Sequence, residues 1–276
     1  MKHAESTGFI DEEFVDFMDA CIQCRGCETA CPAGVEFGSM METTREALAT
    51  QTSYQPWWRR LGYGTLTRPT VLAFASRVLS LLQRIKVVPK KFGLPQIPVI
   101  QRRLSASGTD VWLFTGCIMD AWMRDTRRAV QRVVEATGAG VQFPNKAAAC
   151  CGALHVHAGL GDDARMLAER TMTAFPGDAP ILVDSAGCGA QLKEYGHLLG
   201  TELAENFSTR VFDVHEWLAE RLDDLPVIQK ASERVAVQDP CHLRHVQKSH
   251  QAVHQVLAHY MAVSYTHLPL PTSDLV

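Results

Sequence analysis

Short apolar runs that alternate with longer amphipathic stretches dominate the second half of the chain. Five runs are typical of buried strands, at residues 111–114, 141–143, 181–183, 211–212 and 235–237. Between them, stretches with helical spacing of apolar residues lie at 120–137, 214–222 and 244–259. Short strands that alternate with helices predict an α/β fold with a mainly parallel sheet.

The first half has a different pattern. Helical stretches fill residues 1–50, and a further apolar helix is predicted at 71–82, where Arg77 interrupts it and Lys and Arg residues surround it. Two interpretations are open: a basic amphipathic helix that lies on a membrane or a partner, and a helix packed on the protein's own core, which is the one we favour. Pro89, Pro95 and Pro98 then indicate a linker.

Composition narrows the classes of function. The 276 residues are 46% hydrophobic, enough for a core, and the net charge of −3 gives no basic surplus for nucleic-acid binding. The first twenty residues lack the apolar stretch of a secretory signal, and no segment is long enough to span a bilayer. Nine cysteines in such a chain favour metal ligation or redox chemistry over structural disulfides. We therefore expect a cytoplasmic protein, with peripheral contact to the inner membrane as an open alternative.

The strongest motif is a run of four cysteines, Cys21, Cys24, Cys27 and Cys31, followed by Pro32. Its spacing, C-x₂-C-x₂-C-x₃-C-P, is that of bacterial ferredoxins and predicts a [4Fe–4S] cluster. Two-residue gaps let one tight loop wrap several thiolates around a cluster. Zinc sites usually join two C-x₂-C knuckles through a longer loop, so zinc fits this spacing poorly.

The role of Cys31 stays open. In two-cluster ferredoxins the fourth cysteine of each run ligates the other cluster, and this sequence contains no second run. Cys31 either completes the site or has lost its cluster, which would leave Cys21, Cys24 and Cys27 without a fourth protein ligand.

A second group of cysteines follows predicted strand ends. Cys117 follows Gly116, Cys150 and Cys151 precede Gly152, and Cys188 lies between two glycines. Strand-end loops of a parallel sheet meet at its carboxyl edge, so these four cysteines can converge on a second iron–sulfur site. Ordinary burial of small side chains is the alternative, and the flanking glycines favour a cofactor.

A partial duplication adds a ninth cysteine. Residues 235–241, a strand followed by Cys241, resemble residues 111–117, so we count Cys241 among the candidate metal ligands. His155, His157 and His242 lie near these cysteines, and we expect them to be surface or hydrogen-bonded residues rather than ligands. Asp184 and Asp239 follow strands, and two roles are open: orienting cluster or substrate groups, and capping the next helix, which we favour.

Four segments carry a resemblance to a known family: residues 21–35, 149–153, 185–196 and 239–248. Together they resemble the iron–sulfur subunit of glycolate oxidase and its relatives in lactate utilisation and heterodisulfide reductases. The resemblance implies two ferredoxin clusters followed by two cysteine-rich domains, each with a Cys-Cys-Gly. Gln191 stands where heterodisulfide-reductase relatives carry a further cysteine.

The resemblance also divides the chain. It implies a ferredoxin-type [4Fe–4S] region at 1–50, a helical linker region at 51–108, a first cysteine-rich α/β domain at 109–233 and a truncated start of a second one at 234–262. Residues 263–276 resemble a translated adapter sequence, so we expect them to be a foreign tail.

In function, the resemblance implies electron transfer. An FAD-binding oxidase subunit would oxidise glycolate or another 2-hydroxy acid such as lactate, and this chain would pass the electrons to a quinone or another acceptor. Two alternatives stay open: a heterodisulfide-reductase-like subunit with a catalytic iron–sulfur site, and a zinc-bearing scaffold protein.

Overall fold

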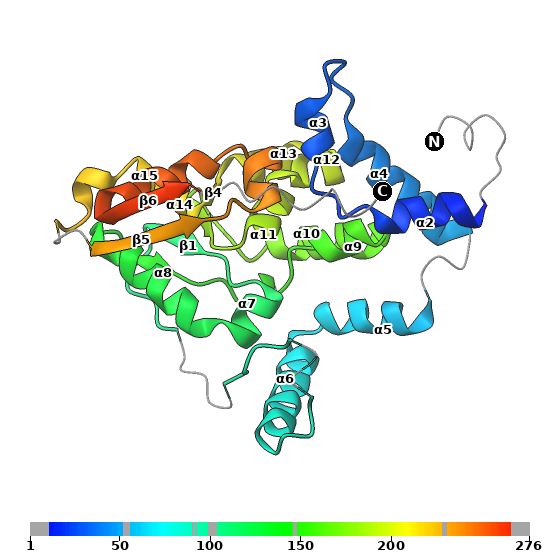
Figure 1. Ribbon diagram of the computed structural model, residues 1–276, viewed down its shortest axis with the longest axis horizontal. Coiled ribbons are helices and arrows are strands. Elements are labelled where there is room, and N and C mark those ends of the chain that lie inside the picture. The colour runs from blue at the N-terminus through cyan, green and yellow to red at the C-terminus, as the bar shows by residue number, and fades with distance from the viewer. Residues whose placement is uncertain are drawn as a thin grey trace.

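Figure 1 shows the computed structural model, which describes residues 11–51, 56–89, 91, 93–98, 104–145, 148–227 and 231–265. Five helices make up its first part: α2 (Glu12–Ala20), α3 (Gly26–Ala30), α4 (Phe37–Gln51), α5 (Trp57–Leu66) and α6 (Pro69–Arg84). Asp11 begins α2 as its N-cap, because its carboxylate accepts a 2.8 Å hydrogen bond from the Phe14 N–H. Met18 of α2 packs against Leu48 and Ala49 of α4, which gives this part a small core of its own.

A four-stranded parallel sheet, in the order β2-β1-β3-β4, forms the centre of the second part. Its strands are β1 (Val111–Leu113), β2 (Val141–Gln142), β3 (Ile181–Val183) and β4 (Val211–Asp213). The predicted α/β fold with a parallel sheet is thereby confirmed. A separate parallel pair is formed by β5 (Ala231–Val237) and β6 (Met261–Tyr265).

Helices connect these strands and cover both faces of the four-stranded sheet (Figure 1). Between β1 and β3 lie α7 (Cys117–Trp122), α8 (Arg124–Ala136), α9 (Ala153–His157) and α10 (Gly161–Met172). Then follow α11 (Ala186–Lys193), α12 (Tyr195–Leu199), α13 (Glu202–Thr209), α14 (Val214–Ala219), the 3₁₀-helix η3 (Leu222–Asp224), the π-helix η4 (His242–Val246) and α15 (His250–Tyr260).

Alternating strand residues divide the core between the two faces. Val111, Leu113 and Leu182 point to the face covered by α8, α14 and α15. Phe114, Ile181, Val183 and Val211 belong to the opposite core, with Phe175, Tyr195 and Phe207. Because side chains alternate along a strand, three-residue strands suffice to supply both cores.

Two predicted helices are divided in the structure. The stretch predicted at 120–137 consists of α7 and α8, which meet at Met123, whose φ of −127° and ψ of 37° are not helical. The stretch predicted at 244–259 consists of η4 and α15, because Lys248 between them has a left-handed φ of 57°. Periodicity alone does not reveal such single-residue breaks.

The favoured interpretation of residues 71–82 is confirmed only in part, because Leu72 packs against the buried cluster of Leu66, Cys150 and Leu167. These residues do form a helix, α6, but α6 projects away from the sheet (Figure 1). Phe74 is 69% exposed and Leu81 is 54% exposed, while the buried residues of α6 are Ser76 and Ser80. The apolar stripe of this helix therefore lies outside the core.

Candidate functional site

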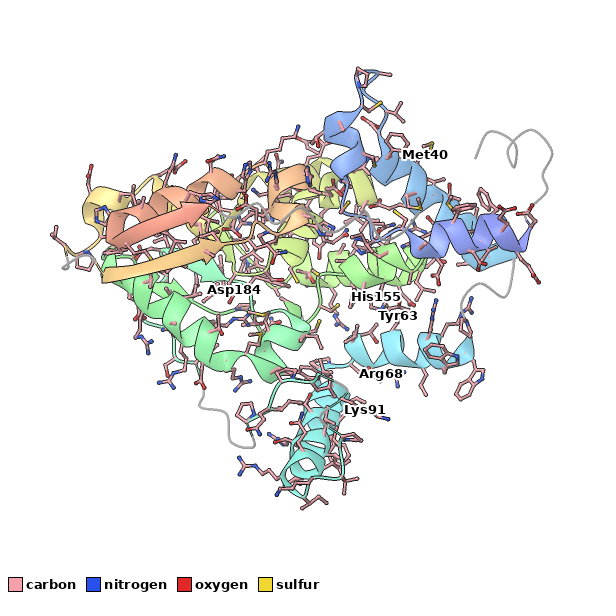
Figure 2. The ribbon with its side chains drawn as sticks, in the orientation of Figure 1. Met40, Tyr63, Arg68, Lys91, His155 and Asp184 are labelled. Carbon is pink, nitrogen blue, oxygen red and sulfur yellow. The ribbon has the colours of Figure 1, made fainter. Side chains whose placement is uncertain are left out.

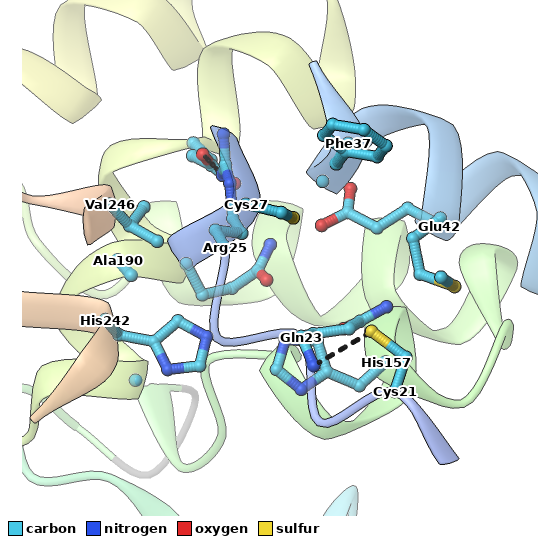
Figure 3. A pocket seen from close by; sticks show the side chains of 15 residues that line it. Cys21, Gln23, Arg25, Cys27, Phe37, Glu42, His157, Ala190, His242 and Val246 are labelled. Atoms are coloured by element: carbon cyan, nitrogen blue, oxygen red, sulfur yellow. Dashed lines mark hydrogen bonds and ion pairs between the residues drawn. The ribbon is translucent and has the colours of Figure 1, made fainter. Parts of the chain in front are cut away.

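The loop of residues 21–31, hereafter the cysteine loop, turns tightly between α2 and α4. Gln23 and Arg25 have left-handed φ values of 53° and 57°, which reverse the chain twice within three residues. The Gln23 N–H consequently points back at the loop and donates to Cys21 Sγ over 3.4 Å (Figure 3). Backbone donors of this kind stabilise a negatively charged sulfur.

The sulfur of Cys31 also accepts hydrogen bonds from the main chain. The N–H groups of Val35, Ala33 and Gly34 surround it and lower the pKa of the Cys31 thiol. This arrangement favours the thiolate, which is the form that binds metal. This backbone environment suits the predicted role of Cys31 as a cluster ligand, which stays a prediction.

Gln23 provides the test of whether the cysteine loop fits a cluster. Its side chain is only 5% exposed, and both its amide nitrogen and its amide oxygen lack a hydrogen-bond partner among the described residues. It lines a pocket together with Cys21 and Cys27 (Figure 3). Buried amides are normally satisfied, so the unpaired Gln23 indicates a missing polar group beside these sulfurs. Together with the donor set of closely spaced thiols, it fits an iron–sulfur cluster.

Arg45 of α4 fastens the cysteine loop to the α/β domain. Its guanidinium donates to the Cys21 carbonyl over 2.6 Å and to the His157 carbonyl over 2.7 Å, and it also binds the Met18 carbonyl. Arg45 is 5% exposed, so these bonds are shielded from water. A single buried cation therefore joins the start of the loop to the end of α9.

A second attachment forms at Arg25. Its guanidinium pairs with Glu28 within the loop at 2.8 Å and with Glu194, which follows α11. Glu42 of α4 also lines this region, and burial, with the nearby charges of Glu194 and Glu28, raises its pKa to about 7 against the opposing effect of Arg25. Surplus carboxylates around one arginine thus hold a proton near neutral pH.

The pocket beside the loop, hereafter the loop pocket, lies between the two groups of cysteines. It is lined by Cys21, Cys27 and Glu42 from the first part of the chain and by His157, Gly187, Gln191, Glu194 and His242 from the second part. Figure 3 shows His157 beside Cys21 and Gln23 in this pocket. Gly187 immediately precedes Cys188, so the loop pocket connects the neighbourhoods of both predicted sites.

The second group of cysteines converges as predicted. Thiol hydrogen bonds link Cys117 to Cys150, Cys150 to Cys151, and Cys151 to Cys188, the last over 3.2 Å between the two sulfurs. We call these four residues the buried cysteine row. They come from three strand-end loops, and Cys150 and Cys151 are only 2% and 4% exposed.

Protons are shared unequally along the row. Hydrogen bonds from Cys117 and Cys151 lower the pKa of Cys150, and a hydrogen bond from Cys151 lowers that of Cys188. The hydrogen bond between Cys117 and Cys150, together with burial, raises the pKa of the Cys117 thiol. The pKa of the Cys151 thiol is raised by its hydrogen bonds to Cys150 and Cys188 and by burial. Hydrogen bonding between neighbouring thiols thus favours the thiolate at Cys150 and Cys188 and the thiol at Cys117 and Cys151. Iron cations could replace the thiol protons, so the donor set fits a polynuclear iron–sulfur site.

No three His, Cys, Asp or Glu side chains in the described part of the chain form a ready-made site for a single metal ion. The assignment of a site to the row therefore depends on the contacts among its own sulfurs.

The Cys-Cys-Gly turn is fixed by its backbone. Gly152 has a φ of 86°, in the left-handed region that glycine adopts without strain. Thr171 donates to the Cys150 carbonyl over 3.2 Å, and Tyr195 donates to the Cys151 carbonyl over 2.8 Å. Thr171 and Tyr195 are fully buried, so the two sulfurs are held rigidly.

A buried ion pair holds the other two strand ends. Arg127 of α8 and Asp184 after β3 pair over 3.1 Å, and Arg127 also donates to the Thr115 carbonyl. The Arg127 side chain is fully buried and that of Asp184 is 4% exposed. Thr115 and Asp184 lie shortly before Cys117 and Cys188, so the pair positions both ends of the row.

The predicted capping role of Asp184 is wrong, since Ser185 is the N-cap of α11. Asp239 likewise binds His254 over 3.0 Å rather than capping η4.

His155 departs most from the sequence-based expectation. It is fully buried, and neither ring nitrogen has a hydrogen-bond partner that meets distance and angle criteria among the described residues. Its ring lies close enough to Cys150 to lower that thiol's pKa, and it faces Tyr63 of α5 with ring centroids 5.8 Å apart (Figure 2). The prediction of a surface residue is therefore wrong, whereas the interaction with Cys150 agrees with the hydrogen-bonded alternative.

His157 and His242 stack across the loop pocket, with ring centroids 5.5 Å apart. Burial, then the charges of His242 and Arg45, lowers the pKa of His157 to about 4, so its ring is neutral at physiological pH. Cys241 precedes His242 and is half-buried. It does not occur among the recorded contacts of the row, and its role as a ligand stays a prediction.

Some of the residues that build the site carry no motif. Arg45, Arg127 and Gln23 were missed because arginine or glutamine in a helix or loop gives no local signal of burial. A signal for Arg127 did exist, since it lies on the apolar side of an amphipathic stretch, three residues before Val130.

Comparison with known proteins supports iron–sulfur chemistry. Residues 111–193 match the family model of the cysteine-rich domain CCG. The chain is 28% identical, over 90% of its length, to the probable glycolate oxidase iron–sulfur subunit of Bacillus subtilis, and 27% identical, over 94%, to the glycolate oxidase iron–sulfur subunit of Escherichia coli. It spans 64% and 66% of the length of these relatives. One subunit of the fumarate reductase (CoM/CoB) of Methanothermobacter marburgensis is 37% identical over 49% of the chain and 26% of that protein.

No solved structure matches the chain. The chain is thus a homologue of glycolate oxidase iron–sulfur subunits with a cysteine-rich CCG domain, related to lactate utilisation proteins, and these similarities support cluster binding and an electron-transfer role. Among the described helices, none combines the length and apolar character needed to cross a membrane.

Proposed function

We propose that the chain carries electrons between a flavoprotein and an acceptor by means of two iron–sulfur sites. Cys21, Cys24, Cys27 and Cys31 would hold a [4Fe–4S] cluster, and the buried cysteine row would hold a second, polynuclear site. When bound, each group supplies a centre that accepts and releases single electrons. The protein's residues supply ligation, burial and hydrogen bonds that set the potentials.

The observation that carries this proposal is the attachment of the two cysteine groups to each other. Arg45 binds the Cys21 carbonyl and the His157 carbonyl at once, and Arg25 binds Glu194. Cys21 and Cys27 of the loop line the loop pocket together with Gly187, the residue before Cys188 of the row. A chain in which two thiol clusters are held in fixed relation has the arrangement that a relay needs.

The remaining assignments follow from the relatives. By analogy with the glycolate oxidase subunits, we propose that an FAD-binding subunit oxidises glycolate or a similar 2-hydroxy acid, and that a quinone or another acceptor takes the electrons. The division of the chain at residues 50, 108, 233 and 262 also remains a proposal, and three of these boundaries fall inside α4, β5 and β6. Residues 266–276, most of the proposed foreign tail, lie outside the described residues.

A cleft beside Cys117 favours a second candidate function. It has a volume of about 680 Å³ and is lined by Thr115, Gly116, Cys117, Asn145 and residues of α6. A small disulfide substrate in this cleft would take up two electrons and two protons and give two thiols, which makes the row a reaction site rather than a relay. Titration of the reduced protein with a heterodisulfide separates the two, because only a reaction site releases two thiols per disulfide.

Anaerobic reconstitution with iron and sulfide tests the main proposal. We expect both elements in the purified protein, with Cys24→Ser removing the iron of the loop and leaving that of the row. Cys151→Ser should do the reverse, so each variant is the other's control, and EPR spectra of the two should be complementary. Zinc without iron and sulfide would refute the proposal and support a scaffold role instead.

A further inference from the structure

Positive charge is concentrated in one segment of the chain. Residues 47–109 contain ten of the 27 Lys and Arg residues and none of the 30 Asp and Glu residues. The protein as a whole carries a charge of −3, so this segment is a basic region in an otherwise acidic molecule. Helices α5 and α6 lie within it, and they occupy the same side of the molecule (Figure 1).

The apolar stripe of α6 is largely exposed, and its Phe74 also lines the cleft beside Cys117. Val71, Phe74, Val78, Leu81 and Ile85 follow one another at intervals of three and four residues, and all five are between 40% and 69% exposed. This spacing places them on one face of the helix. A helix that belonged to the core would bury such a stripe.

The side of α6 opposite the stripe holds it to the protein through two serines and through Leu72, which packs against the cluster of buried Leu167. Ser76 accepts a 3.0 Å hydrogen bond from the Trp122 indole, and Ser80 donates to the Ile97 carbonyl over 2.7 Å. Both serines are buried. The orientation of α6 is therefore fixed by specific bonds, and the exposure of its apolar stripe is a consequence of them.

Aromatic and cationic side chains accompany the stripe. Trp57 and Trp58 of α5 are 76% and 57% exposed, and the Arg59 guanidinium lies 5.4 Å from the Trp58 ring. On α6, the exposed Arg77 and Arg84 flank the stripe, and Lys86 follows the helix. Tryptophan together with long cationic side chains around an apolar stripe is typical of helices at the membrane–water interface.

We propose that α5 and α6 form a docking surface for an anionic lipid membrane. The stripe of α6 would enter the acyl boundary while the arginines and lysines bind lipid phosphates. An acidic protein partner could neutralise the charge, but exposed Trp57 and Trp58 beside an unbroken basic segment favour a lipid surface. With 16 residues, α6 is suited to lie on the membrane and not to cross it.

This inference goes beyond the proposed function, because it depends on neither cluster. It does place the Cys117 cleft near the lipid, since Leu72, Ala73 and Ser76 of α6 line that cleft. A lipid-soluble acceptor would then reach the row without leaving the membrane region.

Vesicle binding by the whole purified chain tests the proposal. We expect it to sediment with phosphatidylcholine vesicles that contain phosphatidylglycerol, to bind weakly to phosphatidylcholine alone, and to be released by high salt. Brominated lipid should quench tryptophan fluorescence, which reports entry of the α5–α6 region into the acyl boundary. The double variant Phe74→Ser/Leu81→Ser should weaken vesicle binding by about tenfold or more, given the transfer energies of these side chains.

Two further variants separate the apolar from the electrostatic part. Arg77→Ser/Arg84→Ser should lose about tenfold in binding to anionic vesicles and little on neutral ones. Leu203→Ser, which changes an equally exposed leucine (73%) on α13, should bind as the wild type does. Circular dichroism of all variants checks that the fold is retained.

Two results would overturn the proposal. One is a wild-type chain that does not bind anionic vesicles, or that binds them as well with Phe74→Ser/Leu81→Ser. The other is a chain dimer that this double variant dissociates in the absence of vesicle binding, which would assign the stripe to a second copy. Neither result would change the iron content, so failure here is distinguishable from failure of the proposed function.

Discussion

The cysteine loop and the buried cysteine row bring their four thiols together in opposite ways. The loop gathers four cysteines within eleven residues, leaves Cys27 exposed, and directs backbone N–H groups at Cys21 and Cys31. The row gathers four cysteines from positions 71 residues apart in the sequence, buries Cys150 and Cys151, and surrounds them with other thiols. The loop thus depends on local backbone conformation, whereas the row depends on the whole sheet.

This difference predicts which substitutions should disturb each group of cysteines. A change in the core of the α/β domain should disturb the row and spare the loop. A substitution at the contact between α4 and α9 should weaken the attachment of the cysteine loop to the α/β domain and leave the buried cysteine row intact. The variants below use these expectations, from the largest expected effect to the smallest.

Removing Arg127 should break the row most strongly. Arg127→Met leaves the Asp184 carboxylate buried and unpaired, and the loss of one partner of a buried pair costs about 3–5 kcal/mol of unfolding free energy. Urea unfolding measures the loss, and the thiols of the row should become reactive towards a thiol reagent. Arg127→Met/Asp184→Asn removes both charges and should recover much of the stability. Equal stability of the single and wild-type proteins would show that the pair does not hold the row.

Gly159 tests the attachment of the loop. Its φ is +72°, and a Cβ there would lie 2.2 Å from the Arg45 carbonyl oxygen of α4. Gly159→Ala should destabilise the protein by about 2–4 kcal/mol, from left-handed strain plus a backbone clash. Gly177→Ala is a matched control, because Gly177 has a φ of +75° with nothing within 4 Å of its Cβ position. It should lose only about 1–2 kcal/mol. Equal losses of unfolding free energy in the two variants would show that the close contact with the Arg45 carbonyl does not affect stability.

The contrast between the loop and the row also explains which parts of the fold and of the site the sequence predicts. The loop was predictable, because its ligand spacing is local and its chemistry follows from the motif. The convergence of the row followed from a general property of parallel sheets, without any knowledge of its contacts. All four strands of the sheet were predicted to within two residues.

What the sequence did not reveal depends on the environment of single side chains. The orientation of α6 is set by Ser76 and Ser80, whose partners Trp122 and Ile97 are distant in the chain or follow a turn. The burial of His155 depends on Tyr63, from a different region. Neither contact leaves a periodic trace, so hydrophobic patterning predicted the helices but not what they face.

Glu42 offers a smaller and pH-dependent test of the attachment region. Its pKa is raised to about 7 in the folded protein, above its ordinary value of 4.5. The stabilisation linked to its proton is fully present below pH 4.5 and is lost as pH rises through 7. The metal-free chain should therefore lose about 1–3 kcal/mol between pH 5 and pH 8 relative to Glu42→Gln.

Urea midpoints across this pH range measure the effect. Thr43→Ala, at the next and exposed position of α4, should keep the pH profile of the wild type. A profile for Glu42→Gln that runs parallel to the wild-type profile would mean that Glu42 is ionised in the folded protein throughout, and that Arg25 outweighs burial.

His155 is expected to produce the smallest change in stability and the most selective change in the row. In the metal-free chain, its two unpaired ring nitrogens are buried without compensation, so His155→Phe should leave stability unchanged or raise it by about 1 kcal/mol. In the iron-loaded chain, the same variant should shift the EPR signal of the row, because His155 adjoins Cys150, and leave the signal of the loop unchanged. His155→Gln, which keeps a donor, should shift it less. His197→Phe, at an exposed position of α12, controls for the loss of an imidazole. A purely structural histidine would give the opposite pattern, since His155→Phe would then lower stability and leave both EPR signals in place.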